Sequence, residues 1–328
     1  MLTGLPYKTK QFFFVLIKLS IVVGAVYFIY NKLSSNTNID FSLFIDFLIK
    51  NDTFSTKNVV SLLFLTFFNW FFEILKWRNL VGSIKSITFF EASKQSLAAH
   101  TASLITPNRI GDYGAKAVYF NSSLRKRVLL LNLISNVAQM STTILFGSIG
   151  LALFISKFDV AISYFNLLRY IILVIIVMSL FTFGVASNKF NIKGFSMKRI
   201  KDFIKNISLK IHIKNMLFSI VRYLVFSFQF YYLLSLFGAD LRYFEAMMLI
   251  TSMYLLVSII PTVFVFDVII KGSVALYLFS FAGVSELSIL SITMLMWLLN
   301  FVLPSVFGSF HILNFNFDKD MGQTTDIE

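Results

Sequence analysis

SLITPNRIGDYGAKAVYF, residues 103–120, is a short polar interruption in a chain that is otherwise rich in Phe, Leu and Ile. It contains a proline, two glycines and three charged residues, namely Pro107, Gly111, Gly114, Arg109, Asp112 and Lys116. Proline ends helical hydrogen bonding and glycine loosens the backbone. The apolar segments on either side, about 88–105 and 112–121, are therefore predicted to be two short helices that meet at Pro107.

The composition is that of a membrane protein. Of the 328 residues, 57% are hydrophobic and only 14% are charged, against roughly 25% charged in soluble domains. Because apolar runs recur along the whole length, the sequence predicts an all-α polytopic integral membrane protein. The net charge of +13 fits basic cytoplasmic loops. No base-reading module accompanies it, so nucleic acid is not expected as a partner.

Six apolar runs are long enough for a full span of about 20 residues: 11–30, 58–77, 128–154, 168–186, 215–236 and 288–310. Shorter pairs flank Pro107 and Pro261; the second pair covers about 242–260 and 263–280. The loop 187–214 has eight Lys or Arg and one Asp, which places it in the cytoplasm by the positive-inside rule. The last span contains Pro304, where a kink is expected.

Threading these runs gives about six full transmembrane helices plus two re-entrant helical hairpins, one entering from each side. Ten full spans are the alternative, with the same positions for the termini. Residues 1–317 form a single transmembrane domain with halves at about 1–160 and 161–317, and 318–328 form a tail. Both termini are predicted to be cytoplasmic, in a bacterial cytoplasmic membrane.

The two short pairs share a pattern of proline, aspartate and lysine: Pro107, Asp112, Lys116 in the first and Pro261, Asp267, Lys271 in the second. Such a pattern in hairpins of opposite direction is typical of inverted repeats, whose broken helices build a substrate site near the midplane. An acid and a base four residues apart face each other on a helix, so structural ion pairs are the alternative. For Pro107 and Pro261, simple kinks or turns are a separate alternative.

Further charges lie in the apolar runs. Arg109, beside a helix amino terminus, is suited to bind phosphate, or else extends to the headgroups. Glu73 is predicted to contact substrate, with a surface pair to Lys76 as the alternative. Arg222 is expected to extend to the cytoplasmic headgroups. The loop 187–214 mixes lysines with Phe and Ile, which suits a segment lying on anionic lipid or a solvated loop.

Residues 106–120, TPNRIGDYGAKAVYF, resemble the first motif of the lysylphosphatidylglycerol synthase transmembrane-region family, the flippase-like domains. The matching residues are Thr106, Pro107, Arg109, Gly111 and Asp112, with Asn108 in place of a glycine. The second motif of the family is matched at Pro261, but its glycines are replaced and Asp267 falls one residue short of the acidic position. The resemblance implies a helical membrane protein that handles polar lipids.

Larger members of that family carry a soluble aminoacyl-transferase domain, for which a chain ending at residue 328 has no room. We therefore expect a translocator of a polar or anionic phospholipid or of a lipid-linked substrate, and not a lysyl-lipid synthase. In it, Arg109 would hold phosphate, Asp112 and Asp267 would meet the headgroup, and Lys116 and Lys271 would balance charge. Integral-membrane transferase activity with an aspartate base, or a role as membrane subunit of a separate transferase, are the alternatives.

No cofactor or metal is expected, because the histidines are far apart and no nucleotide-binding loop is present. The same scarcity of catalytic motifs favours a non-enzymatic protein. Homo-oligomers are compatible with the sequence.

Overall fold

The computed structural model describes residues 41–104, 106, 110–158, 191–192, 195–259 and 267–315, together with Val23 and Tyr27. Apart from those two single residues, the predicted spans 11–30 and 168–186 lie outside the described residues, as do Pro107, Arg109 and Pro261. The described part is almost entirely helical. Its only strands are β1 (Asn191–Ile192) and β2 (Phe195–Ser196), which pair antiparallel.

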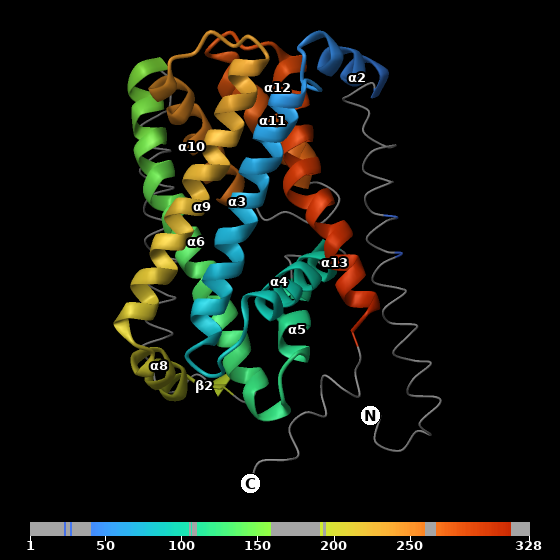
Figure 1. Ribbon diagram of the computed structural model, residues 1–328. Helices are drawn as coiled ribbons and strands as arrows, with labels where there is room; N and C mark the ends of the chain where they lie inside the picture. Colours follow the sequence, from blue (N-terminus) through green and yellow to red (C-terminus); the bar gives the residue numbers. More distant parts are fainter. Residues whose placement is uncertain are drawn as a thin grey trace.

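Four long helices run side by side along the bundle (Figure 1). They are α3 (Thr56–Val81), α6 (Ser122–Phe158), α9 (Leu209–Leu236) and the continuous segment Glu286–Leu313. Each is long and apolar enough to cross a membrane. With 26 to 37 residues, they reach about 39–55 Å at 1.5 Å per residue. The predicted spans 58–77, 128–154, 215–236 and 288–310 are thereby confirmed.

The last long helix is irregular at its centre. It consists of α12 (Glu286–Trp297), a π-helical turn η2 (Leu298–Val302) and α13 (Leu303–Leu313). Pro304 lies at the start of α13, where its missing amide proton removes a helical hydrogen bond. The disturbance predicted at this proline is therefore accompanied by a π-bulge just before it, a feature frequent at functional sites.

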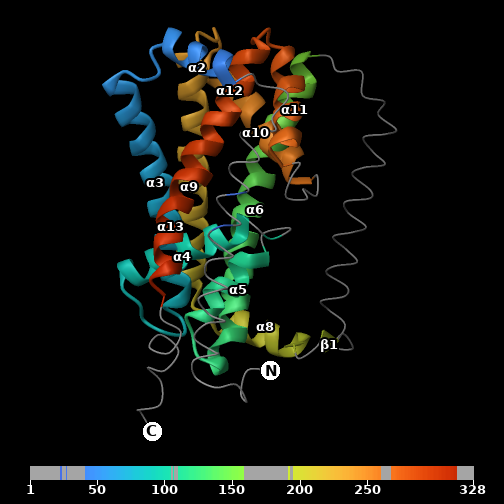
Figure 2. The same ribbon diagram turned by 90° about the vertical axis from the view of Figure 1, so that its right-hand side faces the viewer.

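Two pairs of shorter helices enter the bundle from opposite ends (Figures 1 and 2). The first pair is α4 (Phe89–Leu104) and α5 (Ile110–Val118); the second is α10 (Tyr243–Ile259) and α11 (Asp267–Ser280). Lengths of 9 to 17 residues give about 14–25 Å, less than the roughly 30 Å of a bilayer core. The short arms predicted on both sides of the two proline breaks are thus present.

Small residues allow the hairpin backbones to approach their neighbours closely. A Cβ atom on Gly308 of α13 would lie 2.1 Å from the Thr101 hydroxyl oxygen of α4, and one on Gly111 of α5 would lie 2.3 Å from the Ala102 carbonyl oxygen. Close packing of this kind is typical of helices in membranes, where small residues line the contacts. Gly111, which was expected to loosen the chain, instead lets the two arms of the first hairpin pack together.

Apolar side chains fill two cores and also cover the outside. The larger core lies between α9, α10, α11 and α12, and the smaller one surrounds Trp77 at the end where α3 finishes and α6 begins. Large apolar side chains such as Phe64, Phe67 and Ile149 are exposed along the long helices. The helices α2 (Phe41–Lys50) and α8 (Met197–Asn206) lie at opposite ends of the bundle (Figure 2).

Candidate functional site

A stripe of polar residues runs along the inner face of α3. Thr66, Asn69, Glu73 and Lys76 are three or four residues apart, so a period of 3.6 residues aligns them on one side of the helix. Thr66, Asn69 and Lys76 are almost completely buried, and Lys76 is only 1% exposed. Buried polar groups must be paired to be tolerated in such a setting, and the structure shows their partners.

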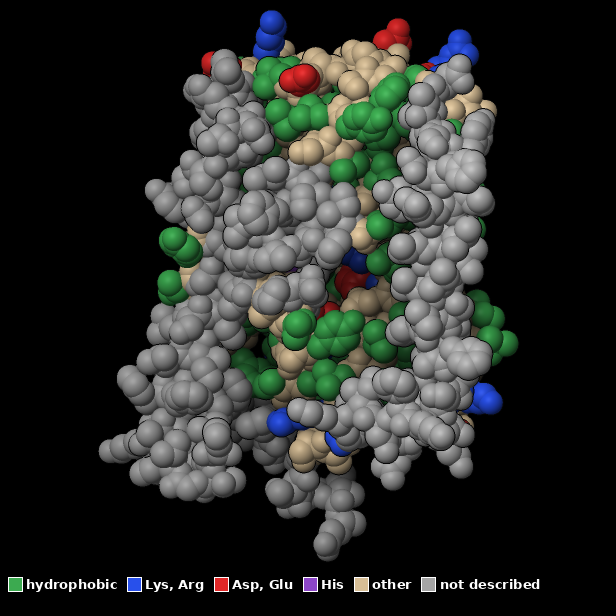
Figure 3. All heavy atoms as spheres, turned by 180° about the vertical axis from the view of Figure 1, so that it is seen from behind, with side chains coloured by type: hydrophobic (Ala, Val, Ile, Leu, Met, Phe, Trp, Pro, Cys, Tyr) green, Lys and Arg blue, Asp and Glu red, His purple; other side chains and the backbone are tan. Residues whose placement is uncertain are grey.

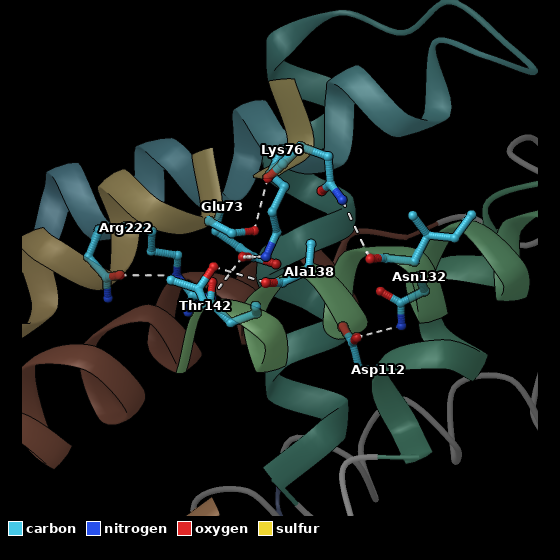
Figure 4. A network of polar contacts seen from close by, with 12 residues as sticks. Glu73, Lys76, Asp112, Asn132, Ala138, Thr142 and Arg222 are labelled. Carbon is cyan, nitrogen blue, oxygen red and sulfur yellow. Dashed lines mark hydrogen bonds and ion pairs between the residues drawn. The ribbon is translucent and has the colours of Figure 1, made fainter. Parts of the chain in front are cut away.

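Glu73 is the centre of the first group of contacts (Figure 4). Its Oε2 lies 2.8 Å from Lys76 Nζ and 2.9 Å from a terminal nitrogen of Arg222. The pair with Lys76 was considered a surface contact from the sequence, but Lys76 is buried. Because one carboxylate faces two cations, Glu73 joins α3 to α9.

Arg222 points inward, and the expectation that it extends to the headgroups is wrong. Because α9 begins at Leu209, six residues before the predicted span, Arg222 lies about 20 Å along the helix, near its middle. Besides binding Glu73, Arg222 donates through Nε to Asn69 Oδ1 at 3.0 Å and through a terminal nitrogen to Gln139 Oε1 at 3.4 Å. Its guanidinium thereby connects α3, α6 and α9.

The second group is provided by the first hairpin and α6. Lys116 Nζ lies 3.1 Å from Asp112 Oδ1 and donates to Asn132 Oδ1 at 2.8 Å, while Asn132 donates back to Asp112 Oδ2 at 2.6 Å. Lys116 also lies 4.6 Å from the centre of the Trp77 ring, within the range of a cation–π interaction. The predicted pair four residues apart thus forms, and Asn132 closes it into a triangle.

These two groups form one charged cluster, defined as Glu73, Lys76, Asp112, Lys116 and Arg222. Three cations and two carboxylates give it a formal charge of +3 − 2 = +1. Lys116 is close enough to act electrostatically on Glu73. Lys76 and Lys116 are buried, whereas Arg222 keeps 24% and Asp112 19% of their side chains exposed.

The face of the molecule opposite to the view of Figure 1 is hollowed at mid-height. In the recess, acidic and basic side chains are visible between apolar ones (Figure 3). Charged side chains in such a recess can contact a molecule that occupies it. Such intramembrane charges are costly and are usually functional.

A chain of buried amides continues from the charged cluster across the bundle. Asn69 Nδ2 donates to Asn300 Oδ1 at 2.7 Å, Asn300 Nδ2 to Gln229 Oε1 at 2.9 Å, and Gln229 Nε2 to the Thr66 hydroxyl at 2.8 Å. With Arg222 donating to Asn69, the donors all follow one direction, so each bond polarises the next. The chain joins the cluster to the π-bulge.

The π-bulge also meets both hairpins through Phe301. His100 Nε2 of α4 lies 3.1 Å from the Phe301 carbonyl oxygen, and Lys271 Nζ of α11 lies 5.0 Å from the centre of the Phe301 ring. The carbonyl of the neighbouring Asn300 accepts a bond from Trp70 Nε1 at 3.2 Å. A π-turn leaves its carbonyls differently placed from those of an α-helix, and here they bind side chains from α3 and α4.

The structure therefore brings together Glu73, Asp112 and Lys116 of the predicted site, and it places Lys271 against the π-bulge. Asp267 begins α11, but its side chain is outside the described part, as is Arg109. The sequence did not predict that Arg222 points into the bundle, nor that the side-chain amides of Asn69, Gln229 and Asn300 are buried and bonded to one another. The available signal was the spacing of polar residues in apolar runs, three, four and seven apart, which marks a buried helix face.

Long apolar helices that bury charges between them define this chain as an integral membrane protein. Comparisons with known protein families, with characterised proteins and with solved structures give no match. Among the described residues, no three His, Asp or Glu side chains are grouped so that they could hold a metal ion.

Proposed function

We propose that the protein moves a polar or anionic phospholipid between the leaflets of its membrane, in the manner of the flippase-like proteins that residues 106–120 resemble. The observation that carries the proposal is the charged cluster. It has a formal charge of +1, it lies between apolar helices, and Arg222 and Asp112 remain partly accessible in it. A phosphate matches the cationic excess, while acyl chains suit the exposed apolar side chains outside.

The orientation follows from the charges at the two ends. The end that holds α8 is strongly basic, with Lys85, Arg125, Lys126 and Arg127 as well as the lysines of α8 and early α9. The other end mixes both signs: Lys50, Lys57, Lys157 and Arg242 against Asp46, Asp52, Asp240, Glu245 and Glu286. By the positive-inside rule, we place the basic end in the cytoplasm, and a cytoplasmic location of both termini stays a prediction. The first hairpin then re-enters from the cytoplasm and the second from outside.

Exchange of ion-pair partners would let a lipid enter without leaving a charge unpaired. In the structure, Arg222 is bound by Glu73, which Lys76 also binds. A phosphate could replace Glu73 at Arg222 while Lys76 keeps Glu73 neutralised. A cationic or hydroxylated headgroup would then meet Asp112. Arg109, near Asp112 in sequence, would add a second phosphate contact, and Asp267 and Lys271 would serve the opposite hairpin.

The test is lipid translocation by the purified full chain in liposomes. Fluorescent phosphatidylglycerol or phosphatidylcholine is included in both leaflets, and a membrane-impermeant reductant bleaches only what reaches the outer leaflet. Arg222→Gln removes a cation of the cluster. Lys157→Gln is the matched control, because it removes a cation from the exposed pair with Glu245. Arg109→Ala tests the motif residue.

We expect wild type and Lys157→Gln to expose the anionic lipid much faster than protein-free vesicles do. A charge-assisted hydrogen bond contributes about 1.5–3 kcal/mol, so Arg222→Gln should be about 10- to 100-fold slower, because every 1.4 kcal/mol is tenfold. If wild type is no faster than empty vesicles with either lipid, translocation of these lipids is refuted. Equal rates for Arg222→Gln and Lys157→Gln would remove the cluster from the mechanism.

A further inference from the structure

A second basic surface lies away from the charged cluster, where α8 meets α9. We define this basic elbow as α8 (Met197–Asn206) together with the first turns of α9, to Leu217. In Figure 1, α8 lies across the end of the bundle while α9 runs along it. The side chain of His212 in α9 contacts the Ile204 carbonyl oxygen of α8 at 3.3 Å, which helps to fix the bend.

The inner side of the elbow is packed against the bundle. Phe203, Ile207 and Ile211 contact the smaller apolar core around Trp77. Asn79 Nδ2 of α3 donates to the Ile211 carbonyl oxygen at 2.9 Å. The elbow is therefore an ordered part of the bundle that presents a defined outer side.

The outer side of the elbow combines exposed apolar side chains with exposed lysines. Ile204, Leu209, Ile213 and Leu217 are exposed, and Leu209 is 72% exposed. Lys205, Lys210 and Lys214 are exposed between them. A solvated basic loop explains the lysines but not the apolar residues, and an acidic protein or nucleic acid would leave the apolar residues equally unexplained. A lipid surface accounts for both, because headgroup phosphates meet the lysines and acyl chains meet the apolar tips.

The length of α9 places this surface at the membrane boundary. Its 28 residues reach about 42 Å, some 12 Å more than a bilayer core of about 30 Å. No basic residue lies in its last turn, whereas Lys210 and Lys214 lie among its first six residues. The excess length therefore falls at the elbow and puts it in the headgroup layer.

We infer that the basic elbow is a binding surface for anionic lipid headgroups, separate from the charged cluster. The inference does not rest on lipid translocation. The elbow would nevertheless concentrate anionic lipid beside the first hairpin, because it packs on the same apolar core as Trp77, which contacts Lys116. The lysines provide the attraction, and the apolar residues set the depth.

The chain contains no cysteine, so Leu209→Cys provides a unique site for an environment-sensitive fluorophore. The labelled full chain is placed in nanodiscs of phosphatidylcholine alone or with one quarter phosphatidylglycerol. Phe244→Cys is the matched control, because Phe244 is 86% exposed near the opposite end of the bundle. Emission wavelength and quenching by neutral acrylamide report how deeply each label lies.

Phosphatidylglycerol should shift the emission of the Leu209 label to shorter wavelength and protect it from acrylamide, with no change at position 244. Replacing Lys205, Lys210 and Lys214 by Gln should abolish this response while the melting temperature stays near that of wild type. The inference is overturned if the Leu209 label does not respond to phosphatidylglycerol, or if the triple variant responds as wild type does. Neither readout depends on transport.

Discussion

Replacing Glu73 by Gln tests whether the charged cluster is held together by its one central carboxylate. Oε2 of Glu73 lies within 2.9 Å of two cations, Lys76 and Arg222. The variant keeps the shape of the side chain but raises the formal charge of the cluster from +1 to +3 − 1 = +2. Lys76 is 1% exposed, so water cannot replace the carboxylate that its ammonium group loses in the variant. Removing one partner of a buried pair costs about 3–5 kcal/mol.

Thermal unfolding in detergent measures this cost. At about 2.1 cal/mol/K of unfolding entropy per residue, a chain of 328 residues shifts by about 1.5 °C per kcal/mol, so Glu73→Gln should lower the melting temperature by about 4–7 °C. Glu245→Gln is the control, because it breaks the exposed pair with Lys157, and such pairs contribute about 1 kcal/mol or less. Adding Lys76→Met to Glu73→Gln returns the formal charge to +2 − 1 = +1 and should recover most of the loss. A double variant no more stable than Glu73→Gln, or a Glu73→Gln variant as stable as Glu245→Gln, would refute the reasoning.

Three further substitutions test other parts of the fold, again by thermal unfolding. Gly308→Ala would bring a Cβ atom within 2.1 Å of α4, so we expect the free energy of unfolding to fall by about 1–3 kcal/mol. Gly114→Ala is the control, because a Cβ atom there has nothing within 4 Å, and it should be neutral or slightly stabilising. Equal effects of the two variants would argue against tight packing of α4 on α13. Asn300→Leu strands two buried amides and should cost about 2–6 kcal/mol at 1–3 kcal/mol each; a neutral result would show that the amide chain contributes no stability. Glu91 accepts bonds from the amide and hydroxyl of Thr88, which lowers its pKa below the usual 4.5. The stability that Glu91 contributes is therefore present above pH 4.5 and is lost as the pH falls through the lowered pKa. The melting temperature of wild type should exceed that of Glu91→Gln at about pH 7 and converge with it in acid, whereas a difference that stays constant with pH would contradict this.

Much of the architecture was predictable because the length of the apolar runs and the positions of the charges determine it. Runs of about 20 apolar residues predict long helices in a bilayer, and the four described spans agree with the structure. The breaks at Pro107 and Pro261 predicted the short arms, since proline cannot continue a helical ladder. The pair Asp112–Lys116 followed from helical spacing alone.

The cluster could be predicted only in part, because it depends on how different helices rotate against each other. Glu73 and Asp112 are 39 residues apart in sequence, and no local pattern shows that α3 and α5 face the same space. Arg222 was misplaced because hydropathy located the start of its span six residues too late, at 215 instead of 209. The π-bulge at Leu298–Val302 has no sequence signature beyond its neighbour Pro304.

The two hairpins resemble each other in pattern but differ in what they contact. The first brings Asp112 and Lys116 to the charged cluster, while the second brings Lys271 to Phe301 of the π-bulge. His100 of the first hairpin lies against the same residue, so Phe301 contacts both hairpins. Phe301 is the neighbour of Asn300, which lies in the middle of the amide chain and is joined to Arg222 through Asn69. We therefore expect a shift of either hairpin to act on Phe301 and, through Asn300, on the amide chain. Coupling between the two membrane faces would then follow from this shared contact, without any requirement that the hairpins be equivalent repeats.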